Sequence, residues 1–177
     1  MNEAHKNTTH QIETTELTAA ELGHLFTTYI TNTMAKCGLT YFIQTTNDTD
    51  IKSMTETSLT AASDMVDKVK DIYQKVNHPI PQGFTDEDVN LKAAKLFSDT
   101  FVLNYLRFNQ QYALFTYSTA LMQSTRADVR TFFSYCVDIS RELYNKTQDM
   151  LLSKGLFLDL LPYRYQSRLV MCISKVI

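Results

Sequence analysis

The chain has 177 residues, of which 44% are hydrophobic and 20% are charged, and its formal net charge is −2. This length and composition are typical of one globular domain with a sizeable core. The near-neutral balance provides no basic stripe, so we expect no nucleic-acid partner. Glycine occurs 4 times and proline 3 times, which favours long helices over a sheet protein rich in turns.

The cysteines and the amino terminus indicate the compartment. Cys37, Cys136 and Cys172 are far apart and odd in number, with neither zinc-site spacing nor a disulfide framework. A reducing compartment is therefore expected. Residues 1–16 are polar and lack the apolar centre of a signal peptide. We expect this stretch to be a flexible arm and the protein to be cytoplasmic.

The first helix has a clear start. Thr18 can cap it, and Glu21 lies three residues later, where its side chain can reach back to complete a capping box. Leu17 and Leu22 are spaced for a hydrophobic staple across this cap. The apolar face then repeats at helical spacing. Its members are Leu22, Leu25, Phe26, Tyr29, Thr33, Cys37 and Tyr41.

A second helix and a long connection follow. Asp48 or Asp50 can cap the helix, whose apolar residues recur at steps of three and four over 51–76, as in the seam of an antiparallel bundle. The members are Ile51, Met54, Ser58, Ala61, Met65, Ile72 and Val76. The prolines after His78 end this helix. Residues 78–94 could span about 55 Å if extended, whereas a helix of about 28 residues is about 42 Å long, so this segment can cross the bundle.

The third helix, Leu96 to Met122, has only Asp99 and Arg107 as charged residues and is apolar on all sides. Such a helix must be covered from several directions, by sister helices or by another subunit. Polar residues interrupt any run long enough to cross a membrane. We therefore interpret it as the buried helix of a bundle. Asp99 and Arg107 should pair with charged groups on neighbouring helices or reach the surface at a groove.

The tyrosines of this helix have two open interpretations. Tyr105, Tyr112 and Tyr117 could pack in the core, as aromatic residues usually do. Alternatively, they could line an apolar patch for a second subunit, since Tyr is enriched at interfaces.

The fourth helix follows after a short link, so it must be the antiparallel neighbour of the third. Thr125 with Asp128 predicts a capping pair, and Gly155 is placed to end the helix in a left-handed conformation. One face of the helix is mostly apolar. It consists of Val129, Phe133, Cys136, Ser140, Leu143, Thr147 and Met150.

The sequence offers little catalytic chemistry. A di-metal carboxylate bundle needs two Glu-x-x-His spacings, and the helices contain one, Glu21 to His24. Glu21 is already explained as a cap at a helix end, so we interpret His24 as a surface or packed histidine. Cys37 and Cys136 lie on apolar faces, and neither a phosphate loop nor a nucleophile elbow is visible. We therefore expect no enzyme activity, no catalytic residues, no cofactor and no metal.

Five short stretches resemble one family. They are the run Glu-Leu-Thr-Ala-Ala-Glu-Leu-Gly at 16–23, the crossover at 79–90, Leu-Phe-Ser-Asp at 96–99, Ser-Thr-Arg-Ala-Asp-Val-Arg at 124–130, and Lys-Gly-Leu-Phe at 154–157. Over residues 16–157 the chain resembles the spore coat protein F-like family of endospore-forming bacteria, whose function is unknown. The resemblance implies a ferritin-like four-helix bundle and a role linked to the spore or its coat. It implies no catalytic residues.

Residues 158–177 depart from that family. Its members commonly follow this glycine with Arg-Pro-Pro and then alternating Ile and Pro. In a shifted reading frame, the codons for residues 158–166 permit Arg-Pro-Pro-Ser-Ile-Pro-Ile-Pro. We therefore hypothesise that this tail arises from a frameshift. The hypothesis is refuted if the DNA sequence of this segment does not encode Arg-Pro-Pro-Ser-Ile-Pro-Ile-Pro in the shifted frame.

Together these features predict an all-α, ferritin-like four-helix bundle over residues 17–157, with a long crossover between the second and third helices. The leading functional hypothesis is a non-enzymatic structural or assembly protein that associates with itself or with other spore coat proteins. The alternative is a ferritin-like metal-binding or oxidant-handling protein. A third possibility, a carrier of an apolar ligand between the helices, requires an enclosed pocket.

Overall fold

The computed structural model describes residues 16–156, and the regular structure within this range is helical. This confirms the predicted all-α four-helix bundle. The predicted arm at residues 1–16, except for its last residue, and the predicted tail at 158–177 lie outside the described residues. The elements are α2 (Ala19–Thr45), α3 (Thr49–Lys75), the 3₁₀ turn η1 (Asp86–Asp88), α4 (Asp99–Gln123) and α5 (Ala127–Ser153).

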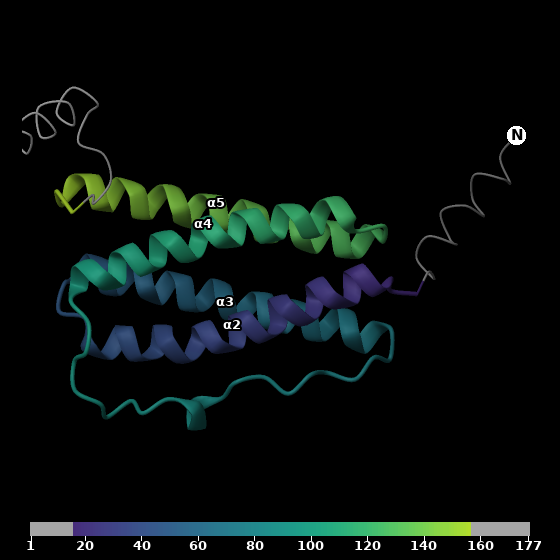
Figure 1. Ribbon diagram of the computed structural model, residues 1–177, viewed down its shortest axis with the longest axis horizontal. Helices are drawn as coiled ribbons and strands as arrows, with labels where there is room; N and C mark the ends of the chain where they lie inside the picture. The colour runs from purple at the N-terminus through teal and green to yellow at the C-terminus, as the bar shows by residue number, and fades with distance from the viewer. Residues whose placement is uncertain (1–15, 157–177) are drawn as a thin grey trace, which may run out of the picture.

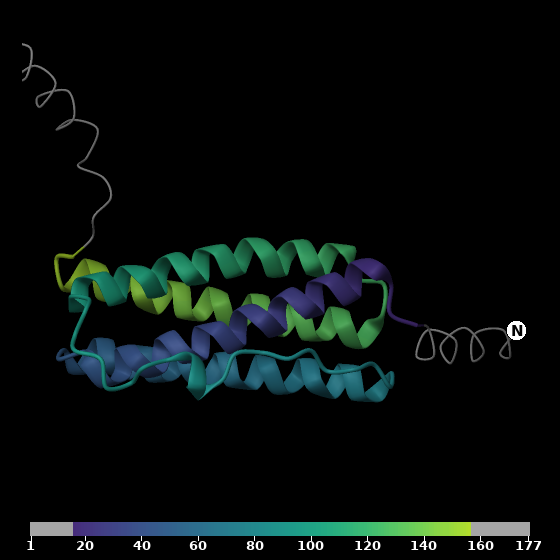
Figure 2. The same ribbon diagram turned by 60° about the horizontal axis from the view of Figure 1, so that its bottom comes forward.

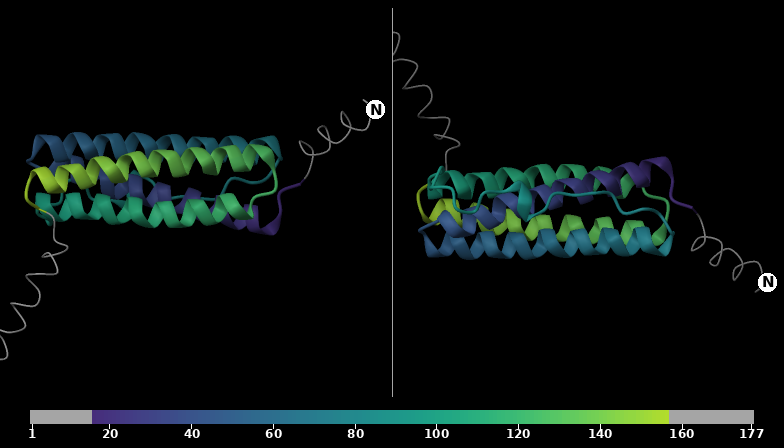
Figure 3. Two further views of the ribbon diagram at one scale, coloured as in Figure 1. Left: turned by 90° about the horizontal axis from the view of Figure 1, so that it is seen from above. Right: turned by 90° about the horizontal axis from the view of Figure 1, so that it is seen from below.

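The four helices form two hairpins that lie side by side. In Figure 1, α2 pairs with α3 and α4 pairs with α5, and each pair packs internally more closely than the two pairs pack on each other. The segment between α3 and α4 returns along the full length of the bundle, which confirms the predicted crossover (Figure 2). Seen from below, it lies over α2 (Figure 3).

Hydrogen bonds fasten the crossover to α2. The hydroxyl of Tyr41 donates to the carbonyl of Ala94 at 2.7 Å and accepts from the backbone N–H of Leu96 at 2.9 Å. The Sγ of Cys37 donates to the carbonyl of Thr85 at 3.2 Å. Cys37 therefore lies half-buried under the crossover and not in the core, whereas Cys136 is fully buried as expected.

One crossover glycine makes a testable contact. A Cβ at Gly83 would lie 2.7 Å from Cγ2 and 2.8 Å from Oγ1 of Thr33, a short side chain that cannot move away. We expect Gly83→Ala to lower the free energy of unfolding by about 1–3 kcal/mol through overpacking.

The matched substitution is Gly38→Ala inside α2, where the new Cβ would meet nothing within 4 Å. Because alanine is the better helix former, this variant should gain about 0.5–1 kcal/mol. Thermal unfolding followed by circular dichroism measures both. A Gly83→Ala protein as stable as the wild type would contradict the packing of the crossover on α2.

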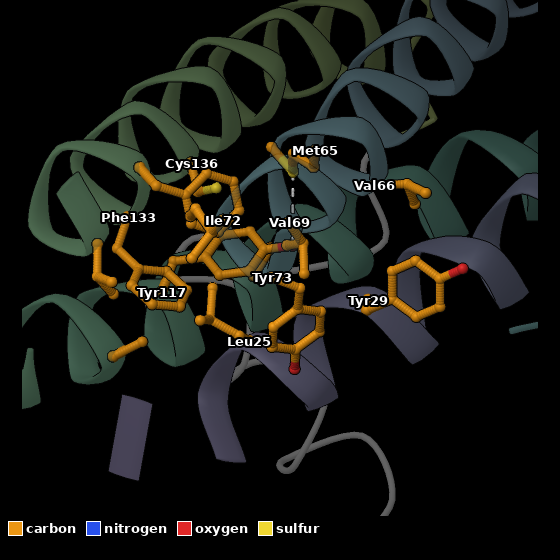
Figure 4. Close-up of a cluster of buried hydrophobic side chains, with 14 residues drawn as sticks. Leu25, Tyr29, Met65, Val66, Val69, Ile72, Tyr73, Tyr117, Phe133 and Cys136 are labelled. Atoms are coloured by element: carbon orange, nitrogen blue, oxygen red, sulfur yellow. Dashed lines mark hydrogen bonds between the residues drawn. The ribbon is translucent and has the colours of Figure 1, made fainter. Parts of the chain in front are cut away.

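The core has two clusters, one toward each end of the bundle. Figure 4 shows the first, in which Leu25 and Tyr29 of α2 meet residues of the other three helices, among them Tyr73, Tyr117 and Phe133. The predicted apolar faces of α3 and α5 are buried almost throughout. The second cluster contains Leu39, Tyr41, Phe42, Ile51, Met54, Ala62, Val102, Leu103, Leu106, Leu143 and Leu151.

The predicted description of the third helix is wrong in two respects. The helix begins at Asp99, because the Ser98 side chain caps it by accepting from the N–H of Phe101 at 3.1 Å. Leu96 and Phe97 therefore precede it. The helix is also not buried on all sides: Tyr112 is 64% exposed. The physical reason is that α2, α3 and α5 contact only part of its circumference.

Apart from the start of α4, the helix ends follow the sequence signals with one exception. The capping box of Thr18 and Glu21 is present, and Gly155 has a φ of 65°. The predicted capping pair of Thr125 and Asp128 is wrong, because Arg126 occupies the N-cap of α5 without a side-chain cap. The Thr125 hydroxyl instead donates to Glu21 at 3.2 Å, and Asp128 forms an ion pair with Arg126 at 2.8 Å.

Candidate functional site

The bundle has one charged side and one nearly uncharged side. The charged residues of α2 and α4 are Glu21, Lys36, Asp99 and Arg107. By contrast, α3 and α5 carry many charges, with surface ion pairs in each helix. A surface depleted of charge is typical of the centre of a protein–protein interface. The α2–α4 side is therefore the candidate functional surface.

On α4, a row of mostly apolar side chains runs along the outside of the helix. We call it the outer row, and its members follow one another at alternating steps of four and three. This spacing averages 3.5 residues, which is the heptad repeat of helices that supercoil around each other. The outer row consists of Phe101, Tyr105, Phe108, Tyr112, Phe115, Thr119 and Met122.

The outer row is open to solvent in the single chain. Five of its seven members are exposed, from 46% at Phe101 to 79% at Met122, whereas Tyr105 and Thr119 are half-buried. The beginning of the row is recessed, since Tyr105 packs edge-on against Phe42 with ring centroids 5.2 Å apart. Contiguous exposed apolar surface of this kind marks an interaction site in a folded protein.

A second row on α4 faces the core, which explains why the helix is apolar all round. It includes Leu103, Leu106, Ala113, Tyr117 and Ala120, all of which are buried. The core-facing row of α4 therefore packs against the other helices of the same chain, whereas the outer row faces solvent. Of the three tyrosines considered from sequence, Tyr105 and Tyr112 lie on the outer row, whereas Tyr117 belongs to the core.

A groove of about 300 Å³ lies between α2 and α4, beside the outer row. The amide of Asn32 donates to the Tyr117 hydroxyl at 2.9 Å, and this hydroxyl donates to Met65 Sδ at 3.6 Å. Burial raises the pKa of Tyr117, so the hydroxyl remains protonated. The groove is partly open, unlike the enclosed pocket that a carrier of apolar ligands needs. Its walls include His24, Thr27, Thr31, Met34, Tyr105, Phe108, Tyr112 and Thr116.

The middle of the bundle contains a small cavity of about 30 Å³, with room for about one water molecule. Its polar lining consists of amides and hydroxyls without a carboxylate: Asn32, Ser58, Asn109, Gln110, Tyr117 and Ser140. Within residues 16–156, no three His, Cys, Asp or Glu side chains converge in a way that could hold a metal ion. The described helices therefore do not place di-metal ligands at the bundle midpoint.

The Glu-x-x-His pair does not form a joint site. Glu21 is fully buried, and its carboxylate accepts from the backbone N–H groups of Thr18, Thr125 and Arg126 at 2.8, 2.8 and 2.9 Å. His24 Nε2 instead lies 2.7 Å from Oε1 of Gln123. Glu21 is thus the predicted cap, and it also ties the start of α2 to the turn between α4 and α5.

A similar carboxylate contact joins the two hairpins at the opposite end of the bundle. Asp99 accepts from the backbone N–H groups of Asn47 at 3.2 Å and Asp48 at 3.0 Å, in the turn between α2 and α3. Of the two predicted alternatives, a charged partner on a neighbouring helix is wrong for Asp99, which pairs with Lys95 of the crossover and keeps its side chain 22% exposed. Glu21 of α2 thus binds the turn of the α4–α5 hairpin, and Asp99 of α4 binds the turn of the α2–α3 hairpin. These two carboxylates fix the α2–α4 groove at both ends.

Arg107 differs from Asp99 in its surroundings. It is 6% exposed, and its guanidinium lies 4.7 Å from the ring centroid of Phe108 on the outer row. The arginine thereby supports an outer-row side chain without placing a charge on the exposed surface.

The profile of a family described as a protein of unknown function (DUF3231) matches residues 6–159. The chain belongs to this family. Among solved structures, a candidate spore coat protein of Bacillus halodurans C-125 superposes on this DUF3231 protein with a TM-score of 0.77 and 20% sequence identity. The match covers 86% of this chain and 98% of the other, and at this identity it shows a shared fold. No curated protein matches the chain.

The matched family is one of unknown function, as the predicted family is, and the shared fold agrees with the predicted four-helix bundle. None of the described helices of this DUF3231 protein combines the length and apolarity needed to cross a membrane.

Proposed function

We propose that this DUF3231 protein is a non-enzymatic structural or assembly protein that acts by presenting its α2–α4 side to other proteins. The observation that carries the proposal is the outer row of α4, a row of mostly apolar side chains with heptad spacing on the nearly uncharged side of the bundle, five of which are exposed. Covering this row removes apolar surface from water, which favours association.

The proposed setting is the spore coat. Support comes from the family resemblance over residues 16–157 and from the shared fold with a candidate spore coat protein. The partners are then further copies of this chain or other coat proteins. We expect synthesis in the cytoplasm of a sporulating cell and incorporation into the coat in an assembled form that requires the outer row.

Fractionation of spores tests this proposal. A tagged wild-type protein is produced in a sporulating Bacillus beside the double variant Tyr112→Ser with Phe115→Ser. Both positions are more than half exposed, and serine has about the helix propensity of tyrosine and phenylalanine, so the fold should be retained. The wild type should appear in coat extracts of purified spores, and the variant should remain in the mother-cell lysate.

The control is Leu152→Ser on α5, which also removes an exposed apolar side chain but lies outside the outer row. It should fractionate like the wild type. A wild-type protein absent from purified spores, or a double variant retained as well as the wild type, would contradict the proposal.

Metal analysis tests the ferritin-like alternative. The side chains around the bundle midpoint are amides, hydroxyls and apolar groups, which are poor ligands for iron or manganese compared with carboxylates and histidine. Protein produced in medium supplemented with either metal should therefore contain far less than one ion per chain by mass spectrometry after gel filtration. Two bound ions per chain would establish the alternative and refute the proposal.

A further inference from the structure

We infer that the outer row of α4 binds the outer row of a second copy of this chain, with the two α4 helices antiparallel across a two-fold axis near Tyr112. This inference rests on the proposed function and specifies the partner.

The spacing of the outer row points to another helix as the partner. A straight helix has 3.6 residues per turn, so side chains that contact a flat surface would not keep a strict repeat of 3.5 over the length of α4. A row that alternates four and three from Phe101 to Met122 suits a helix that supercoils with it. Within residues 16–156, α4 is the helix whose exposed face carries such a row from end to end.

Charge favours a second copy over a charged partner. Between the ends of α4, Arg107 is the only charged residue, and it is buried. A partner with charged flanking residues would find no opposite charges beside the row, and its own charges would be desolvated without compensation. A second copy brings an uncharged apolar row against an uncharged apolar row.

The shape of the row favours the antiparallel orientation. Its beginning is recessed at Tyr105, which packs edge-on against Phe42 with ring centroids 5.2 Å apart, whereas Met122 at its end stands out with 79% exposure. A two-fold axis perpendicular to α4 places the prominent end of each copy over the recessed end of the other. Such an isologous contact closes on itself and uses the same residues twice.

The area is sufficient for a stable dimer. The 25 residues of α4 are about 38 Å long at 1.5 Å per residue. Together with the flanking surface of α2, the side is about 20 Å wide. Each copy could therefore contribute about 750 Å², close to the roughly 800 Å² per partner of a standard stable interface.

Sedimentation equilibrium of the full chain tests the partner. The wild type should sediment with twice the mass of one chain. The double variant Tyr112→Ser with Phe115→Ser should dissociate at least about a hundredfold more readily, because two aromatic rings at the centre are lost from each copy. Leu152→Ser should remain dimeric, and circular dichroism should show the same helix content in all three proteins.

Spin labels test the orientation. Cysteines at Gln111 or Gln123 are introduced with Cys37 and Cys172 changed to serine, while Cys136 is fully buried and should not react. In the antiparallel dimer, labels at 111 should lie close together. Labels at 123 should be separated by about 33 Å along the helix, from about 11 residues on each side of the axis at 1.5 Å each.

Short distances at both positions, or a wild type that is monomeric at all concentrations, would overturn the inference. A monomer that still enters the spore coat would overturn only the second copy as partner and leave the proposed function standing. A dimer that never associates with spores would overturn the proposed function and leave the second copy as partner standing. The two failures are therefore distinguishable.

Discussion

Replacing Glu21 with alanine should lower the free energy of unfolding by about 3–5 kcal/mol. The carboxylate is fully buried and accepts backbone hydrogen bonds from Thr18, Thr125 and Arg126, which belong to both hairpins. Alanine leaves these donors without their acceptor. Urea unfolding followed by circular dichroism measures the loss, and a loss below about 1 kcal/mol would show that the tie between the hairpins matters little.

The same residue should make stability depend on pH. Burial raises the pKa of the Glu21 carboxyl, but the hydrogen bonds from Arg126, Thr18 and Thr125 outweigh it, and the net pKa is below the ordinary 4.5. Its stabilising contribution is therefore complete above pH 4.5 and is lost as the pH falls through the lower folded-state pKa. Glu21→Gln, which cannot ionise, should differ from the wild type most near pH 7 and least in acid. A difference that grows on acidification would contradict this sign.

Replacing Phe133 with alanine should cost about 3–5 kcal/mol, because its ring is fully buried among Phe132, Tyr117 and His24 and a cavity would remain. Phe115→Ala makes the same chemical change on α4, where the ring is 73% exposed. In dilute protein it should change the free energy of unfolding by less than about 0.5 kcal/mol. Urea unfolding at low and high concentration measures both variants.

The two phenylalanines separate stability from association. The free energy of unfolding of the wild type should rise with protein concentration, since a partner that binds the folded chain stabilises it by mass action. This rise should be smaller in Phe115→Ala. Phe133→Ala should be destabilised at every concentration. If Phe115→Ala cost as much as Phe133→Ala in dilute protein, the outer row would belong to the fold of the single chain and not to an interface.

Much of the fold follows from local signals in the sequence. The Thr18 capping box, the low glycine and proline content and the apolar spacing of α3 and α5 each have a local physical cause, so they predict helices correctly. The crossover was predictable from its length, since extended chain reaches farther than the helix it must pass.

The contacts between hairpins were not predictable in the same way. The turn preceding α5 was expected to cap itself through Thr125, but Glu21, distant in sequence, takes that hydroxyl and the adjacent N–H groups. Periodicity also could not decide whether α4 is covered within one chain. Both of its rows have the spacing of a buried seam, and only the packing of the other helices shows which one is occupied.

Hydroxyl-radical footprinting of the outer row tests the central claim most directly. Tyr112 and Phe115 are well exposed in the single chain, and Leu152 on α5 is a comparably exposed internal reference. If the α2–α4 side is an interface, oxidation of Tyr112 and Phe115 relative to Leu152 should fall as protein concentration rises, and should be lowest in protein extracted with the spore coat. Equal relative oxidation in dilute protein, concentrated protein and coat extracts would contradict the account.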